Sequence, residues 1–298
     1  MTVRFGVLGT GFWAHRVHAA ALAEHPDAEL VGVWGRDLAK AKAVGAEFDV
    51  AGHADVDALL AEVDAVTIAL PPDVQAPLAV RAAQAGKHLL LEKPIALTVE
   101  DADRVAGAVR DAGVASVVFF TWRFQQTTAT WLEQAARTML AGGAGTWLSS
   151  LAGSPFDDSP WRKQRGAMWD IGPHLLSVLV PTLGPVRSVV AGAGLRDTVH
   201  LVLEHDGGRA STLSVSHTVA PMSAGTEVFV HGDAGRLVLL PEEGPATGAF
   251  GVAVDELVAA ATVHGTHPCD AGFGRDVVAV LAAAERALRS GCRETVAG

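Results

Sequence analysis

The chain has 298 residues, a formal net charge of −10, 49% hydrophobic residues and 19% charged residues. This length accommodates two domains, and the composition is typical of a folded globular protein rather than a disordered one. The negative charge argues against nucleic acid and anionic membrane surfaces, because both select clustered lysine and arginine. We therefore expect neither as a partner.

Cys269 and Cys292 are the only cysteines, too few for a disulfide scaffold or a Cys-x-x-Cys metal site. His15 and His18 lie three residues apart without a carboxylate partner, so no metal site is expected. The N-terminus runs straight into a strand pattern without the regions of a signal peptide. No apolar run approaches the ~20 residues of a membrane span. The expected location is the cytoplasm.

The first 120 residues alternate apolar strand patterns with helical patterns. The predicted strands cover residues 3–8, 28–34, 64–70, 87–91 and 114–120, and the predicted helices cover 12–24, 37–44, 55–61, 74–85 and 101–111. Strands that alternate with helices are typical of βαβ units, which build a parallel sheet through right-handed crossovers. The sequence therefore predicts a Rossmann domain, a doubly wound parallel sheet, over residues 1–120.

The pattern changes near residues 119–122. A predicted helix over 128–141 is followed by a Gly-Gly-Ala-Gly turn, a strand near 146–152 and a loop that contains Pro and Trp. Further predicted strands cover 186–191, 199–205, 209–217, 227–231 and 236–240, with a hairpin turn at EHDGGRA, and a final helix covers 272–290. The sequence therefore predicts an α/β domain with a mostly antiparallel sheet over residues 121–298.

The stretch GTGFWA (residues 9–14) directly follows the first predicted strand and begins the first predicted helix. In a dinucleotide site the first glycine allows a tight turn, the second lets the backbone approach the pyrophosphate, and a small third residue lets helix and strand pack closely. The phosphates then accept hydrogen bonds at the helix N-terminus. We expect Gly9, Gly11, Phe12 and Trp13 to contact a dinucleotide.

The end of the second strand bears on which dinucleotide is bound. An NAD site usually offers an acidic residue about 20 residues beyond the glycines, which binds the ribose 2′-hydroxyl. Here the strand ends in Trp34 and Gly35, and Arg36 follows. An arginine pairs with the 2′-phosphate of NADP, whereas a carboxylate repels it. The sequence favours NADP over NAD, with a solvated turn as the alternative role for Arg36, and predicts Asp37 as the N-cap of the next helix.

Glu92, Lys93 and Pro94 stand at the carboxyl end of the predicted strand 87–91, where open α/β sheets bind their ligands. Leu70 and Pro71 end the strand that precedes it in the chain. We expect Leu70, Pro71, Glu92 and Lys93 to line the cofactor site. An ordinary Lys-Pro turn is the alternative.

The chain resembles the glucose–fructose oxidoreductase / inositol dehydrogenase (Gfo/Idh/MocA) family. The resemblance rests on the glycine loop, AGKHLLLEKP (85–94), WRF (122–124) and WDIGPH (169–174), which occur in the family's order. It implies a Rossmann domain followed by an α/β domain with an open antiparallel sheet that mediates homodimer or homotetramer formation. It also implies NAD(P)-dependent oxidation or reduction of a small molecule: a sugar, a polyol or a related carbonyl compound.

Carried over residue by residue, the resemblance makes Lys93, Asp170 and His174 the catalytic set. An imidazole titrates near the operating pH, which suits His174 as the acid/base at the substrate hydroxyl. Lys93, as an ammonium, stabilises charge on the same oxygen. Asp170 lies four residues before His174, at what we expect to be the N-terminus of one helix, and orients the imidazole or binds substrate. The alternatives are an N-cap for Asp170 and a packed core histidine for His174.

Three further residues are candidates for substrate contact, on weaker sequence evidence. We expect Arg123, Trp161 and Arg162 to contact the substrate, because their segments are expected to converge over the nicotinamide; surface or packing roles are the alternatives. Gln75 stands where many family members have histidine, and His18 is a candidate for the histidine often found in the first helix.

Two other functions stay open. One is a reductase or dehydrogenase of an aromatic diol or a heterocyclic substrate on the same fold. The other is a non-catalytic regulator that senses NADP. The intact set of Lys93, Asp170 and His174 counts against the regulator, since a sensor has no need of a proton-transfer unit.

Overall fold

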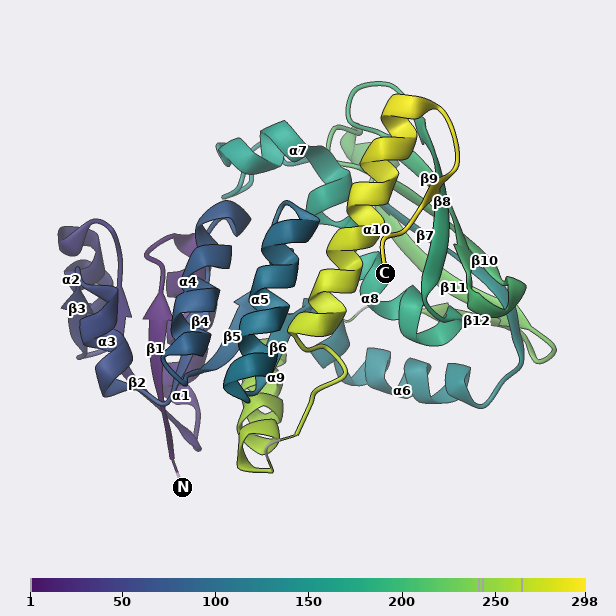
Figure 1. The fold of residues 1–298 in the computed structure, drawn as a ribbon. Coiled ribbons are helices and arrows are strands. Elements are labelled where there is room, and N and C mark those ends of the chain that lie inside the picture. Colours follow the sequence, from purple (N-terminus) through teal and green to yellow (C-terminus); the bar gives the residue numbers. More distant parts are fainter. Residues whose placement is uncertain (1, 241, 243, 264) are drawn as a thin grey trace. The chain divides into compact units, whose positions relative to one another are not determined.

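The computed structural model describes residues 2–240, 242, 244–263 and 265–298. The chain forms two compact units (Figure 1). The first unit comprises Met1–Phe124 and Glu243–Arg275, and the second comprises Gln125–Glu242 and Asp276–Gly298. Each unit is built on its own sheet, so the chain leaves the first unit, builds most of the second and then returns to the first.

The first unit contains a parallel sheet of six strands in the order β3-β2-β1-β4-β5-β6. This is the strand order of a doubly wound Rossmann fold, and the predicted fold class is confirmed. The strands are β1 (Val3–Leu8), β2 (Ala28–Trp34), β3 (Ala51–His53), β4 (Ala65–Ile68), β5 (His88–Glu92) and β6 (Ser116–Phe119). The short strand β3 was not predicted, because three half-exposed residues carry no periodic pattern.

Helices cover both faces of this sheet. They are a π-helical segment (Ala14–Ala19) that continues into α1 (Ala20–Glu24), then α2 (Leu38–Glu47), α3 (Val56–Glu62), α4 (Pro72–Gln84), α5 (Val99–Ala112) and α9 (Ala246–Thr262). The crossovers from β1 to β2 and from β4 to β5 run in opposite directions, so right-handed connections place their helices on opposite faces. Accordingly α4 packs beside α5, and α1 packs beside α9 (Figure 1).

Polar side chains cap the N-termini of α2, α3 and α5. The Asp37 carboxylate accepts hydrogen bonds from the N–H groups of Ala39 (2.9 Å) and Lys40 (3.3 Å), as expected for an N-cap. Thr98 caps α5 in the same way. Helix α9 was not predicted, because its Ala-, Gly- and Val-rich sequence lacks a clear polar face.

The second unit contains a sheet of seven strands in the order β12-β11-β7-β10-β9-β8-β13. All neighbours are antiparallel except β7 and β10, so the sheet is mostly antiparallel, as predicted. The strands are β7 (Leu140–Leu148), β8 (Val186–Ala193), β9 (Val199–His205), β10 (Ala210–Ser216), β11 (Gly225–Gly232), β12 (Gly235–Leu239) and β13 (Glu294–Thr295). The predicted hairpin turn joins β9 to β10.

Helices α6 (Gln126–Ala136), α7 (Pro160–Asp170) and α8 (Gly172–Leu183) pack within the second unit, with α8 against β7 and β10. Helix α10 (Ala271–Ser290) begins in the first unit and continues into the second. Across the described ranges of the chain, no helix combines the length and apolarity that crossing a membrane requires.

The prediction of a Gly-Gly-Ala-Gly turn is wrong. Gly142, Gly143 and Gly145 lie inside β7, where neighbouring strands approach closely. A Cβ atom on Gly142 would lie 2.6 Å from the carbonyl oxygen of Ala210, and one on Gly143 would lie 2.7 Å from that of Phe229. These glycines therefore serve close backbone contact within a strand rather than a turn.

The expectation that Asp170 begins a helix is also wrong. The predicted loop contains α7, and Asp170 is the last residue of this helix. His174 lies in the first turn of the next helix, α8, together with Pro173, a position that tolerates proline. The two residues therefore come from separate helices that meet at Ile171.

We expect Gly143→Ala to destabilise the second unit by about 1–3 kcal/mol, the usual cost of an added methyl group where there is no room. Gly192→Ala in β8 is the matched control, because a Cβ atom there meets nothing within 4 Å. Thermal unfolding of both variants checks this. Equal melting temperatures for the two would contradict the close approach at Gly143.

Candidate active site

The glycine loop at the end of β1 has the geometry of a phosphate-binding turn. Gly9 has a φ of +143°, and a Cβ atom on it would lie 2.6 Å from the Ala69 carbonyl oxygen, so only glycine fits. A Cβ atom on Gly11 would meet nothing within 4 Å. Ala14 is fully buried, which lets the helix pack on the strand. These residues therefore fit a dinucleotide pyrophosphate.

At the end of β2, the Trp34 side chain is buried, and its indole N–H donates to the Ala54 carbonyl at 2.9 Å. Gly35 is buried beside Thr10, whose Cγ2 would lie 2.6 Å from a Cβ atom on the glycine. Arg36 follows and is exposed. The position at which an NAD site carries a carboxylate is thus occupied by a glycine with a solvent-exposed arginine after it.

The carboxylate of Glu92, at the end of β5, is a hydrogen-bond hub. Its Oε1 accepts from the Trp13 indole N–H at 2.6 Å and lies 3.0 Å from His18 Nε2. Because an ionised carboxylate only accepts, Nε2 carries the proton, and Nδ1 accepts from the Thr67 hydroxyl at 2.6 Å. His18 is fully buried, with its ring centroid 4.2 Å from that of Phe250. Glu92 thereby ties the glycine loop to the strand end that precedes Lys93.

Gln75 holds the backbone on both sides of Lys93. Its side-chain amide donates to the carbonyl oxygens of Glu92 (2.7 Å) and Pro94 (3.2 Å), and its Oε1 accepts from the Glu92 N–H at 2.8 Å. The side chain is fully buried, so these bonds are shielded from water. The only sequence signal for this role was that Gln75 replaces a histidine common in the family.

In the second unit, the side chain of Asp170 is buried and 8% exposed. Its Oδ2 accepts from Arg162 Nε at 3.0 Å and from His217 Nε2 at 3.0 Å. The Arg162 guanidinium also stacks over the rings of Phe156 (4.4 Å) and Trp161 (4.6 Å). The structure therefore brings Asp170 together with two of the predicted substrate residues.

His217, at the end of β10, was not predicted. Its Nδ1 lies 2.8 Å from the Ser149 hydroxyl, and its backbone N–H donates to Asp197 Oδ2 at 2.9 Å. Burial raises the pKa of Asp197, but hydrogen bonds from the Thr218 and Ser216 hydroxyls and from the His217 N–H outweigh it, so the pKa lies below its ordinary value. A histidine that ends a strand gives no local sequence signal for such a network.

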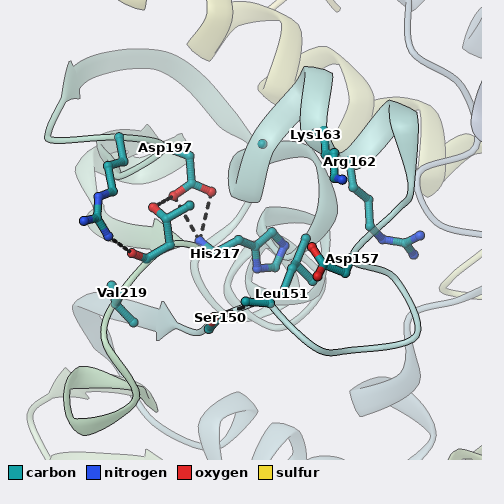
Figure 2. Close-up of a pocket in the computed structure, with 12 residues that line it drawn as sticks. Ser150, Leu151, Asp157, Arg162, Lys163, Asp197, His217 and Val219 are labelled. Atoms are coloured by element: carbon teal, nitrogen blue, oxygen red, sulfur yellow. Dashed lines mark hydrogen bonds between the residues drawn. The ribbon is translucent and has the colours of Figure 1, made fainter.

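The second unit contains a pocket of about 480 Å³. Figure 2 shows His217 near the middle of its lining residues. Its lining comes from the segment after β7, from α7, from the β8–β9 turn and from the end of β10, and consists of Ser150, Leu151, Ala152, Asp157, Arg162, Lys163, Gly166, Arg196, Asp197, His217, Thr218 and Val219. Arg162 and His217, the two residues that bond Asp170, both belong to this lining.

The remaining predicted residues divide between the units. Lys93 and Arg123 belong to the first unit, where Arg123 lies in a 3₁₀ turn (Thr121–Phe124). His174 belongs to the second, where it is buried, and its ring centroid lies 5.5 Å from that of Trp147. Leu70 and Pro71 connect β4 to α4 in the first unit. They directly follow Ala69, whose carbonyl oxygen lies close to Gly9 of the glycine loop.

The chain has relatives among known proteins. It is 35% identical over 195 residues to an uncharacterized oxidoreductase of Synechocystis sp., a match that covers 62% of this chain and only 52% of that protein. It is 32% identical over 258 residues to the dTDP-3,4-didehydro-2,6-dideoxy-alpha-D-glucose 3-reductase of Streptomyces antibioticus, covering 80% of this chain and 75% of that one. The chain thus spans about half the length of the first relative and three quarters of the second.

Solved structures share the fold. The WlbA dehydrogenase of Bordetella pertussis, in complex with NADH and UDP-GlcNAcA, superposes with a TM-score of 0.85 at 23% identity, covering 100% of this chain and 98% of that one. A levoglucosan dehydrogenase in complex with NADH and levoglucosan gives a TM-score of 0.86 at 18% identity, with both chains fully covered.

Two family models cover most of the chain. Residues 3–120 match the oxidoreductase family with an NAD-binding Rossmann fold, and residues 117–238 match the GFO/IDH/MocA C-terminal domain. The glycine loop, the strand order and both matches agree with the resemblance drawn from the motifs. The chain therefore belongs to the Gfo/Idh/MocA family of oxidoreductases.

Proposed function

We propose that the protein is an NADP-preferring dehydrogenase or reductase of a sugar, a polyol or a related carbonyl compound. The observation that carries the cofactor preference is the end of β2, which has no carboxylate: Gly35 is buried there and Arg36 is exposed. Among the described residues, no hydrogen bond or ion pair occupies the Arg36 guanidinium, which leaves it available for a 2′-phosphate. When bound, the nicotinamide cofactor supplies the hydride acceptor or donor.

The chain's own residues supply the proton chemistry. In the proposal, His174 takes the proton of the substrate hydroxyl during oxidation and returns it during reduction. The Lys93 ammonium donates a hydrogen bond to the substrate oxygen and stabilises its developing charge. Gln75 bonds the backbone on both sides of Lys93, so the backbone of Lys93 is already ordered before the reaction. Asp170, held by Arg162 and His217, hydrogen-bonds the substrate or the imidazole.

The substrate class is supported by the relatives. Those at 30% identity or more include proteins that act on levoglucosan, on UDP-N-acetylglucosamine and on a dTDP-linked deoxysugar. The lining of the pocket beside Asp170 includes charged and hydroxyl side chains next to Leu151, Ala152 and Val219, a mixture that suits a sugar, which has both hydroxyl groups and C–H faces. A test panel follows: myo-inositol, D-glucose, levoglucosan and UDP-N-acetylglucosamine, each with NADP⁺ and NAD⁺.

We also propose a homo-oligomer formed through the solvent-facing side of the second unit's sheet. The strand register aligns Val190, Val202, Thr212, Ala144, Phe229 and Val238 in one row across this side. Val190, Val202 and Val238 are 37%, 45% and 39% exposed. A mostly apolar row of this kind on an open sheet suits an isologous interface.

Arg36→Ala is expected to weaken NADPH binding by about tenfold or more, since a hydrogen bond to a charged group contributes roughly 1.5–3 kcal/mol and about 1.4 kcal/mol is tenfold in affinity. NADH binding stays unchanged. Calorimetric titration with both cofactors measures this, and Arg110→Ala, a change at an exposed arginine of α5, is the control. A wild-type preference for NADH would refute the role of Arg36 and leave the fold assignment intact.

Lys93→Met and His174→Asn are each expected to reduce turnover by at least about 10²-fold, the usual cost of removing a group that stabilises the transition state. Cofactor affinity should change little, because the glycine loop and Arg36, which supply most of the expected cofactor contacts, stay intact. Initial rates on the panel, with calorimetry of NADPH binding as the check on folding, test this. Near-wild-type turnover in either variant would remove that residue from the catalytic set.

A further inference from the structure

From the contacts of Asp170 we infer that His217 is a positioning residue for the reaction: it acts by holding the Asp170 carboxylate in place. The inference rests on the proposed function, because it requires Asp170 to take part in catalysis. His217 is far from Asp170 in sequence, comes from a different element and lies outside the family motifs by which the chain was first assigned.

Geometry gives His217 one orientation. Its Nδ1 faces the Ser149 hydroxyl at 2.8 Å and its Nε2 faces Asp170 Oδ2 at 3.0 Å. Since an ionised carboxylate only accepts, Nε2 carries a proton and donates it to Asp170. Nδ1 pairs with the Ser149 hydroxyl. Both ring nitrogens are thus engaged, and the ring cannot rotate without breaking two hydrogen bonds.

The backbone of His217 is fixed as well. Its N–H donates to both carboxylate oxygens of Asp197, at 3.1 and 2.9 Å, and Asp197 also accepts from the Ser216 hydroxyl at 2.7 Å and from Thr218. The side chain of His217 is 5% exposed. A donor held at both its backbone and its ring can hold a second group rigidly, which is what a supporting residue of a catalytic group must do.

Asp170 needs such support. Its buried carboxylate is balanced by the Arg162 guanidinium and the His217 N–H, which reach the same oxygen from α7 and from the end of β10. The other charged groups around the pocket are Asp157, Lys163, Arg196 and Asp197. The Arg162 guanidinium donates hydrogen bonds to Asp170 and Ser159 and also stacks over two aromatic rings. Removing the His217 donor takes away the hydrogen bond that reaches Asp170 from the end of β10.

Two substitutions separate this role from a merely structural one. His217→Gln places an amide N–H near the position of Nε2 and keeps a donor for Asp170. His217→Asn places its amide near Nδ1, so it keeps a partner for Ser149 and loses the donor to Asp170. We expect the Asn variant to lose about 10- to 100-fold in kcat, as is usual when a reacting group is misplaced by about an ångström, while the Gln variant stays within about threefold of wild type.

The measurement is kcat and KM on the best substrate of the panel, with NADPH affinity as the check that the chain is folded. His205→Asn is the matched control, because His205 is also buried and bonds a serine hydroxyl, that of Ser211 at 2.8 Å, but does not belong to the pocket lining. Equal kcat values for the Gln and Asn variants would overturn the inference.

Asp170→Asn distinguishes the two possible failures. If Asp170→Asn lowers kcat and His217→Asn does not, His217 has no positioning role and the proposed function stands. If Asp170→Asn retains wild-type turnover, the proposed role of Asp170 fails and the inference fails with it. In the expected case, the double variant is no slower than Asp170→Asn alone, since His217 acts only through Asp170.

Discussion

The carboxyl ends of β1, β4 and β5 lie next to one another, because the first sheet is parallel and these strands are neighbours in it. This constraint brings together three segments that are distant in sequence: the glycine loop, the β4 end at Ala69 and the strand end at Glu92. The contacts of Gly9 with Ala69 and of Trp13 with Glu92 follow directly from it. The conformation of the segment that carries Lys93 depends on this edge.

Within that edge, polar groups are satisfied from inside the protein. The buried imidazole of His18 bridges Thr67 and Glu92. The buried amide of Gln75 bonds the backbone carbonyl oxygen and N–H of Glu92, where β5 ends. The second unit repeats the principle with Asp170, Arg162 and His217. Buried polar networks of this kind are rigid when every member is bonded, and the proposed proton-transfer groups require such rigidity.

Much of this fold could be predicted from the sequence. Strand–helix alternation and the glycine loop determine the Rossmann sheet because both signals are local: periodicity and a turn that only glycine can make. The errors arose where context overrides local signals. Gly142 and Gly143 look like turn residues, yet close strand approach places them in β7. Asp170 looks like the start of a helix, yet it is the last residue of α7. This helix contains Gly166 with a φ of +69°, a conformation that the helical pattern of the sequence does not reveal. Likewise, the fold brings His217, at the end of β10, to Asp170, at the end of α7. No spacing in the sequence reveals this contact.

The return of the chain to the first unit after residue 242 has a consequence for biosynthesis. Helix α9 supplies Phe250, which packs against His18 and Phe119 (ring centroids 4.2 and 5.1 Å apart) and so covers one face of the first sheet. A ribosome releases the first 124 residues long before it makes this helix. Until α9 has emerged, the nascent first unit therefore exposes an apolar surface, and most of the second unit, residues 125–242, is synthesised before the first can close.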